Sequence, residues 1–367
     1  MASAAQESAE IRHGVWSGLL VACLLAIGAK LLADLAGTAL FHAAKTPVSP
    51  VLCAVLFGVL WRNTLGVAEH FGPGLATTST TVLRIGIALV GLKLTLATVG
   101  QVGLYALPIV IGCMATALGL SCALASPLRL TRNLSQLLAV GAAVCGCTAV
   151  LAVAPIIRAR KDEMGYAVAC VVLFGVLAML AYPWLAHSLL GAHPSAAGIF
   201  LGTAIHDTSQ VIGAGLIYSQ QFDSPDALAA ATTAKLLRNI SMVLLIPWFA
   251  WAAARDSQQT QPAVNLPSAA SLVPAFVWGF VALVVLRTLG DMFVAPTSLG
   301  VSWAAATGYA STASEFLLTA GMAAVGLGIS LDGFRGIGWR PLAAAMIIAL
   351  GVGVVSLLMT YWVSGLM

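Results

Sequence analysis

The sequence predicts an all-α, polytopic membrane protein with about eleven hydrophobic segments. Of its 367 residues, 60% are hydrophobic and 8% are charged, and the mean hydropathy is +0.98. Because soluble domains carry roughly 25% charged residues, no soluble fold of this length would bury so much apolar surface. Apolar runs of about 20 residues, the length that crosses the hydrocarbon core, recur along the chain. Internal repeats and two interrupted segments complete the prediction.

The apolar runs define the expected membrane segments in order. They lie near 14–40, 50–65, 76–98, 103–125, 134–157, 165–190, 196–218, 227–253, 270–288, 301–330 and 341–365. The first is longer than a signal-peptide core, so we expect it to be retained. The seven cysteines lie in apolar runs, which favours buried thiols over disulfides. Basic residues are scattered, with no basic stripe for nucleic acid.

A first internal repeat relates an early part of the chain to its end. Gly91-Leu-Lys-Leu-Thr-Leu96 matches Gly326-Leu-Gly-Ile-Ser-Leu331 at an offset of 235 residues. The preceding segments match at an offset of 224, from Pro50 to Pro274. Seven segments separate the copies, and an odd number of crossings reverses orientation, as in inverted repeats. We therefore expect a first scaffold repeat at about 48–125 within an N-terminal region 1–133, and a second scaffold repeat at 270–367.

A second repeat lies between the scaffold copies. Gly-Ala-Ala-Val-Cys-Gly-Cys-Thr-Ala-Val at 141–150 aligns with Gly-Thr-Ala-Ile-His-Asp-Thr-Ser-Gln-Val at 202–211. The following helices both end in Pro-Trp, at 183–184 and 247–248. An interrupted segment followed by a helix is thus predicted twice, at 134–190 and 191–254.

The distribution of basic residues bears on the topology. If both interrupted segments are re-entrant hairpins, ten basic residues near segment ends share one side, and two lie opposite. The ten are Arg12, Arg62, Arg129, Arg132, Arg158, Arg160, Lys161, Arg255, Arg335 and Arg340, and the two are Lys45 and Arg287. Because positive residues favour the cytoplasmic side, this split favours hairpins and a cytoplasmic amino terminus. Broken crossing helices are the alternative.

The polar cluster of the second interrupted segment is the strongest candidate site. Consecutive polar groups are costly in hydrocarbon unless protein or a cavity satisfies them. His206 and Asp207 are candidates for coupling to H⁺ or Na⁺, since a carboxylate near histidine can favour its charged form. In the structural alternative His206 bonds to a carbonyl and Asp207 caps a half-helix. The predicted substrate-binding residues are Gly141, Cys145, Gly146, Thr148, Gly202, Thr203, His206, Thr208, Ser209, Gln210, Lys235 and Arg238.

The glycines and the two cations of this site each have two possible roles. The glycines either mark unwound backbone, whose free N–H groups would bind an anion, or allow close helix packing. Lys235 and Arg238 are three residues apart and share a helix face, where they would attract an anion or neutralise Asp207. The alternative is that both side chains extend to the membrane interface.

Other polar residues are weaker candidates. Arg84 and Glu315 lie in repeat-related segments and could form a structural ion pair. Cys145 and Cys147 with His206 lack the usual CxxC spacing of a metal site. We expect no metal and no resident cofactor beyond a coupling H⁺ or Na⁺.

These motifs resemble a bacterial membrane family catalogued as sulfate exporters. The stretches 141–150 and 202–211 are similar to its two hallmarks, and Lys235, Arg238 and the closing Gly-Trp-Arg-Pro-Leu at 338–342 fit as well. The chain departs from the family in having Asp207 for a glutamate, and alanines at 142–143 for Thr-Ser. The family is distantly grouped with cation–proton antiporter-like transporters. The resemblance implies an inner-membrane secondary transporter of sulfate or a related sulfur-containing or organic anion.

The expected function is alternating-access transport of a small anion, coupled to H⁺ or Na⁺, and not enzymatic. No GxxxxGK[ST] motif is present, so an ion or substrate gradient would drive it. A cation–proton antiporter with no anion substrate is one alternative. An intramembrane enzyme using His206 and Asp207 is another, although it lacks a convincing nucleophile, and a passive channel would need a continuous polar pore. The expected partners are the anion and the lipid bilayer, with a homodimer left open.

Overall fold

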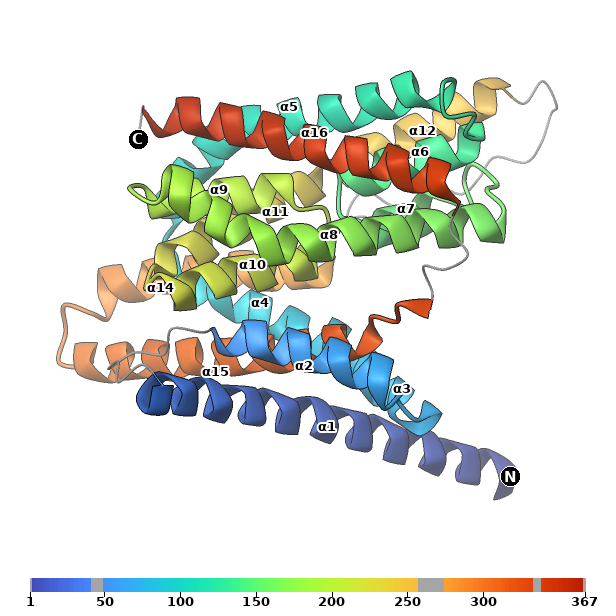
Figure 1. Cartoon of the computed structure of the whole chain (residues 1–367). Helices are drawn as coiled ribbons and strands as arrows, with labels where there is room; N and C mark the ends of the chain where they lie inside the picture. Colours follow the sequence, from blue (N-terminus) through green and yellow to red (C-terminus); the bar gives the residue numbers. More distant parts are fainter. Residues whose placement is uncertain (1, 41–48, 257–273, 333–337, 366–367) are drawn as a thin grey trace. The chain divides into compact units, whose positions relative to one another are not determined.

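The computed structural model is all-helical and confirms the predicted fold class (Figure 1). It describes residues 2–40, 49–256, 274–332 and 338–365. Within these ranges, eight helices are long and apolar enough to cross a membrane. The shorter Pro50–Thr64 and the two interrupted segments account for the other three predicted runs. Lys45 and Arg335 lie outside the described residues.

Every predicted segment is a helix or a group of short helices. Their bounds are α1 Ala2–Leu40, α2 Pro50–Thr64, η1 Glu69–Phe71, α3 Gly72–Thr77, η2 Thr78–Val82, α4 Leu83–Val90, η3 Gly91–Lys93, α5 Leu96–Ala125, α6 Arg132–Ala143, α7 Cys147–Val153, α8 Lys161–Leu190, α9 Pro194–Ala204, α10 Thr208–Gln221, α11 Pro225–Ile240, α12 Met242–Asp256, α14 Ala275–Phe293, α15 Gly300–Gly328 and α16 Trp339–Ser364.

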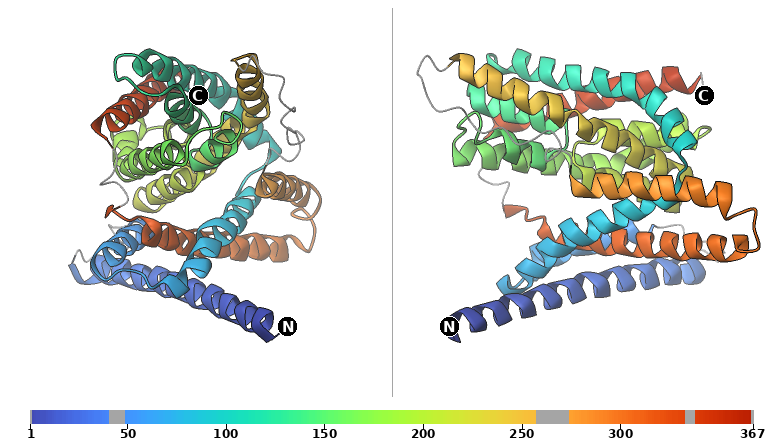
Figure 2. Two further views of the ribbon diagram at one scale, coloured as in Figure 1. Left: turned by 90° about the vertical axis from the view of Figure 1, so that its right-hand side faces the viewer. Right: turned by 180° about the vertical axis from the view of Figure 1, so that it is seen from behind.

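The helices divide into two compact units. Unit 1 consists of Met1–Leu96, Leu216–Pro225 and Gly279–Gly333, and unit 2 of Ala97–Gly215, Asp226–Trp278 and Phe334–Met367. Unit 1 therefore holds most of the first two members of each scaffold repeat. Unit 2 holds the third members, α5 and α16, with the breaks of both interrupted segments, while the end of α10 belongs to unit 1. Figure 2 gives two further views of these helices.

The inverted repeat is visible in the packing of α4 against α15 in unit 1. A Cβ at Gly86 would lie 2.9 Å from Leu318 Cδ2, and a Cβ at Gly321 would lie 2.6 Å from Leu83 Cδ1. Leu83 and Leu318, like Gly86 and Gly321, are related by the 235-residue offset found in the sequence. Each leucine packs on the repeat partner's glycine, as reciprocal contacts across a two-fold axis require.

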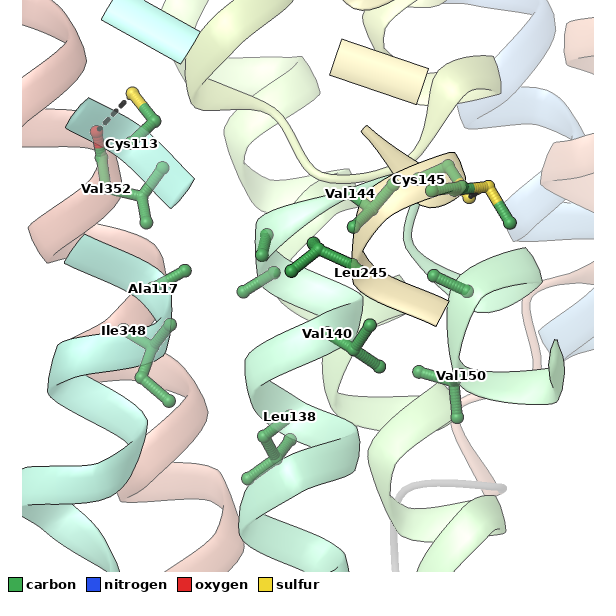
Figure 3. Close-up of a cluster of buried hydrophobic side chains, with 14 of the residues drawn as sticks. Cys113, Ala117, Leu138, Val140, Val144, Cys145, Val150, Leu245, Ile348 and Val352 are labelled. Atoms are coloured by element: carbon green, nitrogen blue, oxygen red, sulfur yellow. Dashed lines mark hydrogen bonds between the residues drawn. The ribbon is translucent and has the colours of Figure 1, made fainter. Parts of the chain in front are cut away.

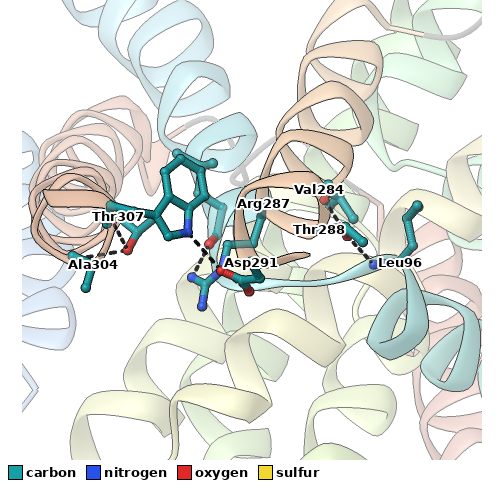
Figure 4. Close-up of polar contacts among 9 residues, drawn as sticks. Leu96, Val284, Arg287, Thr288, Asp291, Ala304 and Thr307 are labelled. Carbon is teal, nitrogen blue, oxygen red and sulfur yellow. Dashed lines mark hydrogen bonds and ion pairs between the residues drawn. The ribbon is translucent and has the colours of Figure 1, made fainter. Parts of the chain in front are cut away.

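The same symmetry fixes the extended links that follow α4–η3 and α15. The backbone N–H of Leu96 donates to Thr288 Oγ1 at 2.9 Å (Figure 4), and that of Leu331 donates to Asn63 Oδ1 at 2.8 Å. Leu96 and Leu331 are repeat partners at the 235-residue offset. Two equivalent backbone donors are thus satisfied by side chains near the ends of equivalent helices, α14 and α2.

The first interrupted segment is a hairpin. Thr131, which precedes α6, donates a 2.5 Å hydrogen bond to Glu163 Oε1 in the first turn of α8. The segment therefore begins beside the start of α8. It also ends there, because α7 stops at Val153 and α8 begins at Lys161 after a short link. The turn between α6 and α7 contains Gly146, whose φ of +71° is a left-handed conformation that favours glycine.

The second interrupted segment enters from the other end of α8. α9 begins at Pro194, directly after α8 ends at Leu190. It runs parallel to α11, because Cβ atoms at Gly198 and Gly202 would meet the carbonyls of Ala227 and Ala231 in that order. α10 then returns, since Gly215 packs against the early turns of α11 again. The predicted pair of hairpins entering from opposite ends is confirmed within unit 2.

An apolar core surrounds the hairpins in unit 2. It joins residues of α5, α6, α7, α12 and α16, among them Ala117, Leu138, Val150, Leu245 and Ile348 (Figure 3). Burial of aliphatic side chains from both hairpins and the long helices holds the short half-helices, which would be marginal alone.

The hairpin topology predicts which ends of the segments share a membrane face. We expect cysteines at positions 132 and 160, in a variant that lacks the seven native cysteines, to react alike with a membrane-impermeant maleimide. A cysteine at exposed His193 should show the opposite accessibility, because α8 separates it from position 160 by about 45 Å at 1.5 Å per residue. Labelling of 132 and 160 from opposite faces would contradict the first hairpin.

Candidate functional site

The tips of the two hairpins meet beside the middle of α8. At the first tip, a Cβ at Gly141 would lie 2.8 Å from Val171 Cγ2. At the second, Gln210 Nε2 donates to the carbonyl of Val172 at 3.1 Å, and its side chain fills the space that a Cβ at Gly175 would need. Both tips therefore lie near the midpoint of a 30-residue helix that is long and apolar enough to cross a membrane.

The tips also contact each other. A Cβ at Gly146 would lie 2.9 Å from Asp207 Oδ2 and 3.0 Å from the Asp207 Cα. Any other residue at 146 would be strained by its positive φ and would collide with Asp207. Gly146 is thus the position where the backbone of one hairpin approaches the carboxylate of the other.

Lys235 binds the carbonyl groups left free where the half-helices end. Its Nζ donates to the carbonyls of Val144 at 3.0 Å, Ile205 at 3.1 Å and also His206. Val144 directly follows α6 and Ile205 directly follows α9. The carboxyl end of each helix carries unpaired carbonyls and about half a negative charge, so one ammonium group compensates both ends.

Arg238 does the same one turn further along α11. Its Nε donates to Ala143 O at 2.8 Å, Nη1 donates to Thr203 O at 2.8 Å, and Nη2 donates to Ala142 O. Like Lys235, its side chain has 0% relative exposure. The two cations share a helix face as predicted, but their hydrogen bonds go to backbone carbonyls and neither extends to the interface.

Asp207 occupies the amino end of α10. Its Oδ1 accepts from the backbone N–H of Ser209 at 2.9 Å and from Ser209 Oγ at 2.5 Å, and its carbonyl accepts from Val211 N. This is the helix-capping role that the sequence left open, and a negative charge is favourable at this end of a helix. Asp207, Thr208 and Ser209 are half-buried, whereas the neighbouring His206 is buried.

His206 faces the interior of unit 2. It is 4% exposed, the Ala142 backbone hydrogen-bonds its ring, and Nδ1 has no hydrogen-bond partner among the described residues. The ring borders a cavity of about 10 Å³ between α6, α8 and α16, about enough for one water. His206 therefore fits the structural alternative of a ring bonded to backbone, and its link with Asp207 in ion coupling stays a prediction.

The remaining predicted residues lie inside the half-helices, at the breaks or in internal contacts. Gly141 and Gly202 lie inside α6 and α9 and permit close helix packing, whereas Gly146 lies in the break itself. Thr148 is exposed beside half-buried Cys147 on the first turn of α7. Two further predicted residues bond internally: Thr203 Oγ1 lies 2.7 Å from Ser356 Oγ, and Cys145 Sγ lies 3.3 Å from Met242 Sδ.

Two other expectations concern groups away from the tips. In the parts of the chain that the structure describes, no group of three or more His, Cys, Asp or Glu side chains could hold a metal ion. In unit 1, Glu315 Oε1 forms a 2.8 Å ion pair with Lys93. Its predicted partner Arg84 lies on an exposed part of α4, and that pairing stays a prediction.

Sequence reasoning gave little weight to three residues that shape the site. Gly175 makes room for Gln210, Ser356 bonds Thr203, and Asn239 Nδ2 lies 3.3 Å from Thr208 Oγ1. A glycine in the middle of a long apolar helix is a signal of close approach, and it was available for Gly175. The spacing of Ser356 carries no such signal, because its partner lies 153 residues away.

Removing one of the interior cations should destabilise the protein. In Arg238→Met, several carbonyls at the hairpin tips lose their donor, and each unsatisfied buried group costs about 1–3 kcal/mol. We expect a marked fall in the thermal-unfolding midpoint of purified protein. Arg129→Met, at an exposed position between α5 and α6, is the matched control. Equal midpoints for the two variants would show that the carbonyl bonds of Arg238 do not hold the tips.

Comparisons with known proteins identify the family of the chain. Residues 17–345 match the family described as "Conserved hypothetical protein 698". A UPF0324 membrane protein of Streptococcus pyogenes is 32% identical over 93% of this chain and 95% of its own length. UPF0324 membrane proteins of Nitratidesulfovibrio vulgaris (30% identical, 90% and 91% covered) and Pseudomonas aeruginosa (29%, 82% of each chain) are similar too. No solved structure matches. The chain therefore belongs to the UPF0324 family of membrane proteins.

Proposed function

We propose that this protein is a secondary active transporter that moves a small anion by alternating access, coupled to H⁺ or Na⁺. The observation that supports it is the meeting of two oppositely directed hairpins at the middle of α8. Non-helical backbone is tolerated at membrane depth where protein or a water-filled cavity surrounds it. Inverted pairs of broken segments are typical of transporters whose sites lie near the bilayer midplane.

The charges around the tips support an anion as the cargo. Lys235 and Arg238 bring two cationic side chains into the interior of unit 2, and Asp207 brings one carboxylate. Their carbonyl partners neutralise part of the positive charge, and the remainder favours an anion near the tips. The half-buried hydroxyl groups of Thr208 and Ser209 would contact it. The choice of sulfate, or a related sulfur-containing or organic anion, rests on the resemblance of the two hallmark stretches.

The setting of the transporter follows from its relatives and its charge pattern. Its relatives in Pseudomonas aeruginosa and Streptococcus pyogenes are membrane proteins, and the chain is polytopic, so we propose that it resides in the bacterial inner membrane. The basic residues at positions 132, 158, 160 and 161 gather at one end of α8. Under the positive-inside rule this end is cytoplasmic, and so is the amino terminus.

One observation favours cation–proton antiport as a second candidate. The cations at the tips are fully buried and bonded to carbonyls, whereas Asp207 is half-buried. A carboxylate is therefore the more accessible charge, and a carboxylate binds cations or protons directly. In that function no anion would be carried.

Flux measurements in proteoliposomes separate the two functions. We expect wild-type protein to take up labelled sulfate, or a competing small anion, when an inward H⁺ or Na⁺ gradient is imposed. Cation-driven pH change that needs no permeant anion would instead establish antiport. Chloride should be replaced by gluconate in both assays, so that the buffer anion does not serve as cargo.

The role of Asp207 is tested in the same assay. Asp207→Asn should lower coupled flux by about tenfold or more, equivalent to at least about 1.4 kcal/mol, because an amide cannot exchange a proton or balance a cation. Asp162→Asn, at an exposed position in the first turn of α8, should keep wild-type flux. Wild-type flux in Asp207→Asn, with protein folded and reconstituted normally, would refute the assignment.

A further inference from the structure

Asn239 has a buried polar atom that the described chain leaves without a partner. The residue lies near the end of α11 and is 2% exposed. Its Nδ2 lies 3.3 Å from Thr208 Oγ1, while its Oδ1 accepts no hydrogen bond from any described residue. A buried carbonyl oxygen without a donor costs about 1–3 kcal/mol, so this oxygen points to a ligand.

The Asn239 amide contacts a hydroxyl oxygen at the amino end of α10. Thr208, which its amide contacts, follows Asp207 in the chain. Asp207 Oδ1 is bonded to Ser209, and Oδ2 faces Gly146, where there is no side chain. Carboxylate, hydroxyl and amide oxygens together are the ligand types of hard cations.

The charges around this position favour a monovalent cation over a divalent one. Asp207 supplies one negative charge, which a monovalent cation balances. Lys235 and Arg238 do not occupy the position, because their donors are directed to the carbonyls that follow α6 and α9. Their positive charge lies close by and opposes a divalent ion more strongly than a monovalent one.

We propose that Asp207, Thr208 and Asn239 form a Na⁺ site, with the Asp207 carboxylate, Thr208 Oγ1 and Asn239 Oδ1 as protein ligands and water completing the shell. The inference rests on the proposed transport function and deepens it, since it names Na⁺ as the coupling ion.

Thermal unfolding of the purified full-length protein in detergent tests binding without any transport. NaCl is titrated against choline chloride at constant ionic strength and constant chloride, so that the cation is the variable. We expect the unfolding midpoint to rise saturably with Na⁺, because a ligand that binds the native state alone stabilises it. Equal midpoints in Na⁺ and choline would overturn the site.

Asn239→Leu is the decisive variant. It replaces the amide with an apolar group of similar size, so the midpoint in choline should stay near that of wild type, while the Na⁺ concentration for half-maximal stabilisation should rise at least tenfold. Asn133→Leu, at a half-buried position at the start of α6, is the matched control and should respond to Na⁺ as wild type does. An unchanged Na⁺ response in Asn239→Leu would refute the role of the amide.

Two further outcomes separate this inference from the proposed function. Stabilisation by sulfate as its choline salt, lost in Asn239→Leu, would mean that the free amide atom is the donor Nδ2, and would overturn the cation site. A saturable Na⁺ response without anion flux in liposomes would support the Na⁺ site and refute the anion cargo. Anion flux that is driven by H⁺ and does not depend on Na⁺ would support the anion cargo and refute the Na⁺ site.

Discussion

The hydrogen bonds from Lys235 and Arg238 to the backbone hold unit 2 together. Breaking a helix inside a membrane leaves several carbonyls without donors, and hydrocarbon offers none. Here two adjacent turns of α11 supply those donors to α6 and α9 at once. Without them, neither hairpin could end at the midplane, and the polar cluster at 206–210 would have no place in the interior.

Because the cations bind only the carboxyl ends of the half-helices, the two helix ends at a break differ in their access to a solute. The carboxyl ends are satisfied by side chains with 0% exposure, so they are closed to a solute. The amino end of α10 carries Asp207, Thr208 and Ser209, which remain half-buried. The groups at the tips that a solute can reach are therefore carboxylate and hydroxyl oxygens. The positive charges of Lys235 and Arg238 are separated from them by the backbone carbonyls that these cations bind.

Much of the fold could be predicted because hydropathy and repetition are properties of the chain itself. All eleven segments were found from apolar runs. The 235-residue offset, found at 91–96 and 326–331, also relates Leu83 to Leu318 and Gly86 to Gly321, and each leucine packs on the glycine of the other repeat. The charge split favoured hairpins, and hairpins are present. The acceptors of Lys235 and Arg238 could not be predicted, because spacing tells which helix face two residues share and not what packs against it. The same limit applies to Gly141 and Gly202, whose helical setting depends on neighbours from α8 and α11.

The scaffold repeats share a backbone plan but differ in charge. Lys93 and Glu315 form an ion pair, whereas the residues at the equivalent positions are Gly328 and Thr80. A perfect two-fold would make the two membrane faces of unit 1 chemically identical. The ion pair has no counterpart at Thr80 and Gly328, so the two halves of unit 1 are related in backbone but carry different charges.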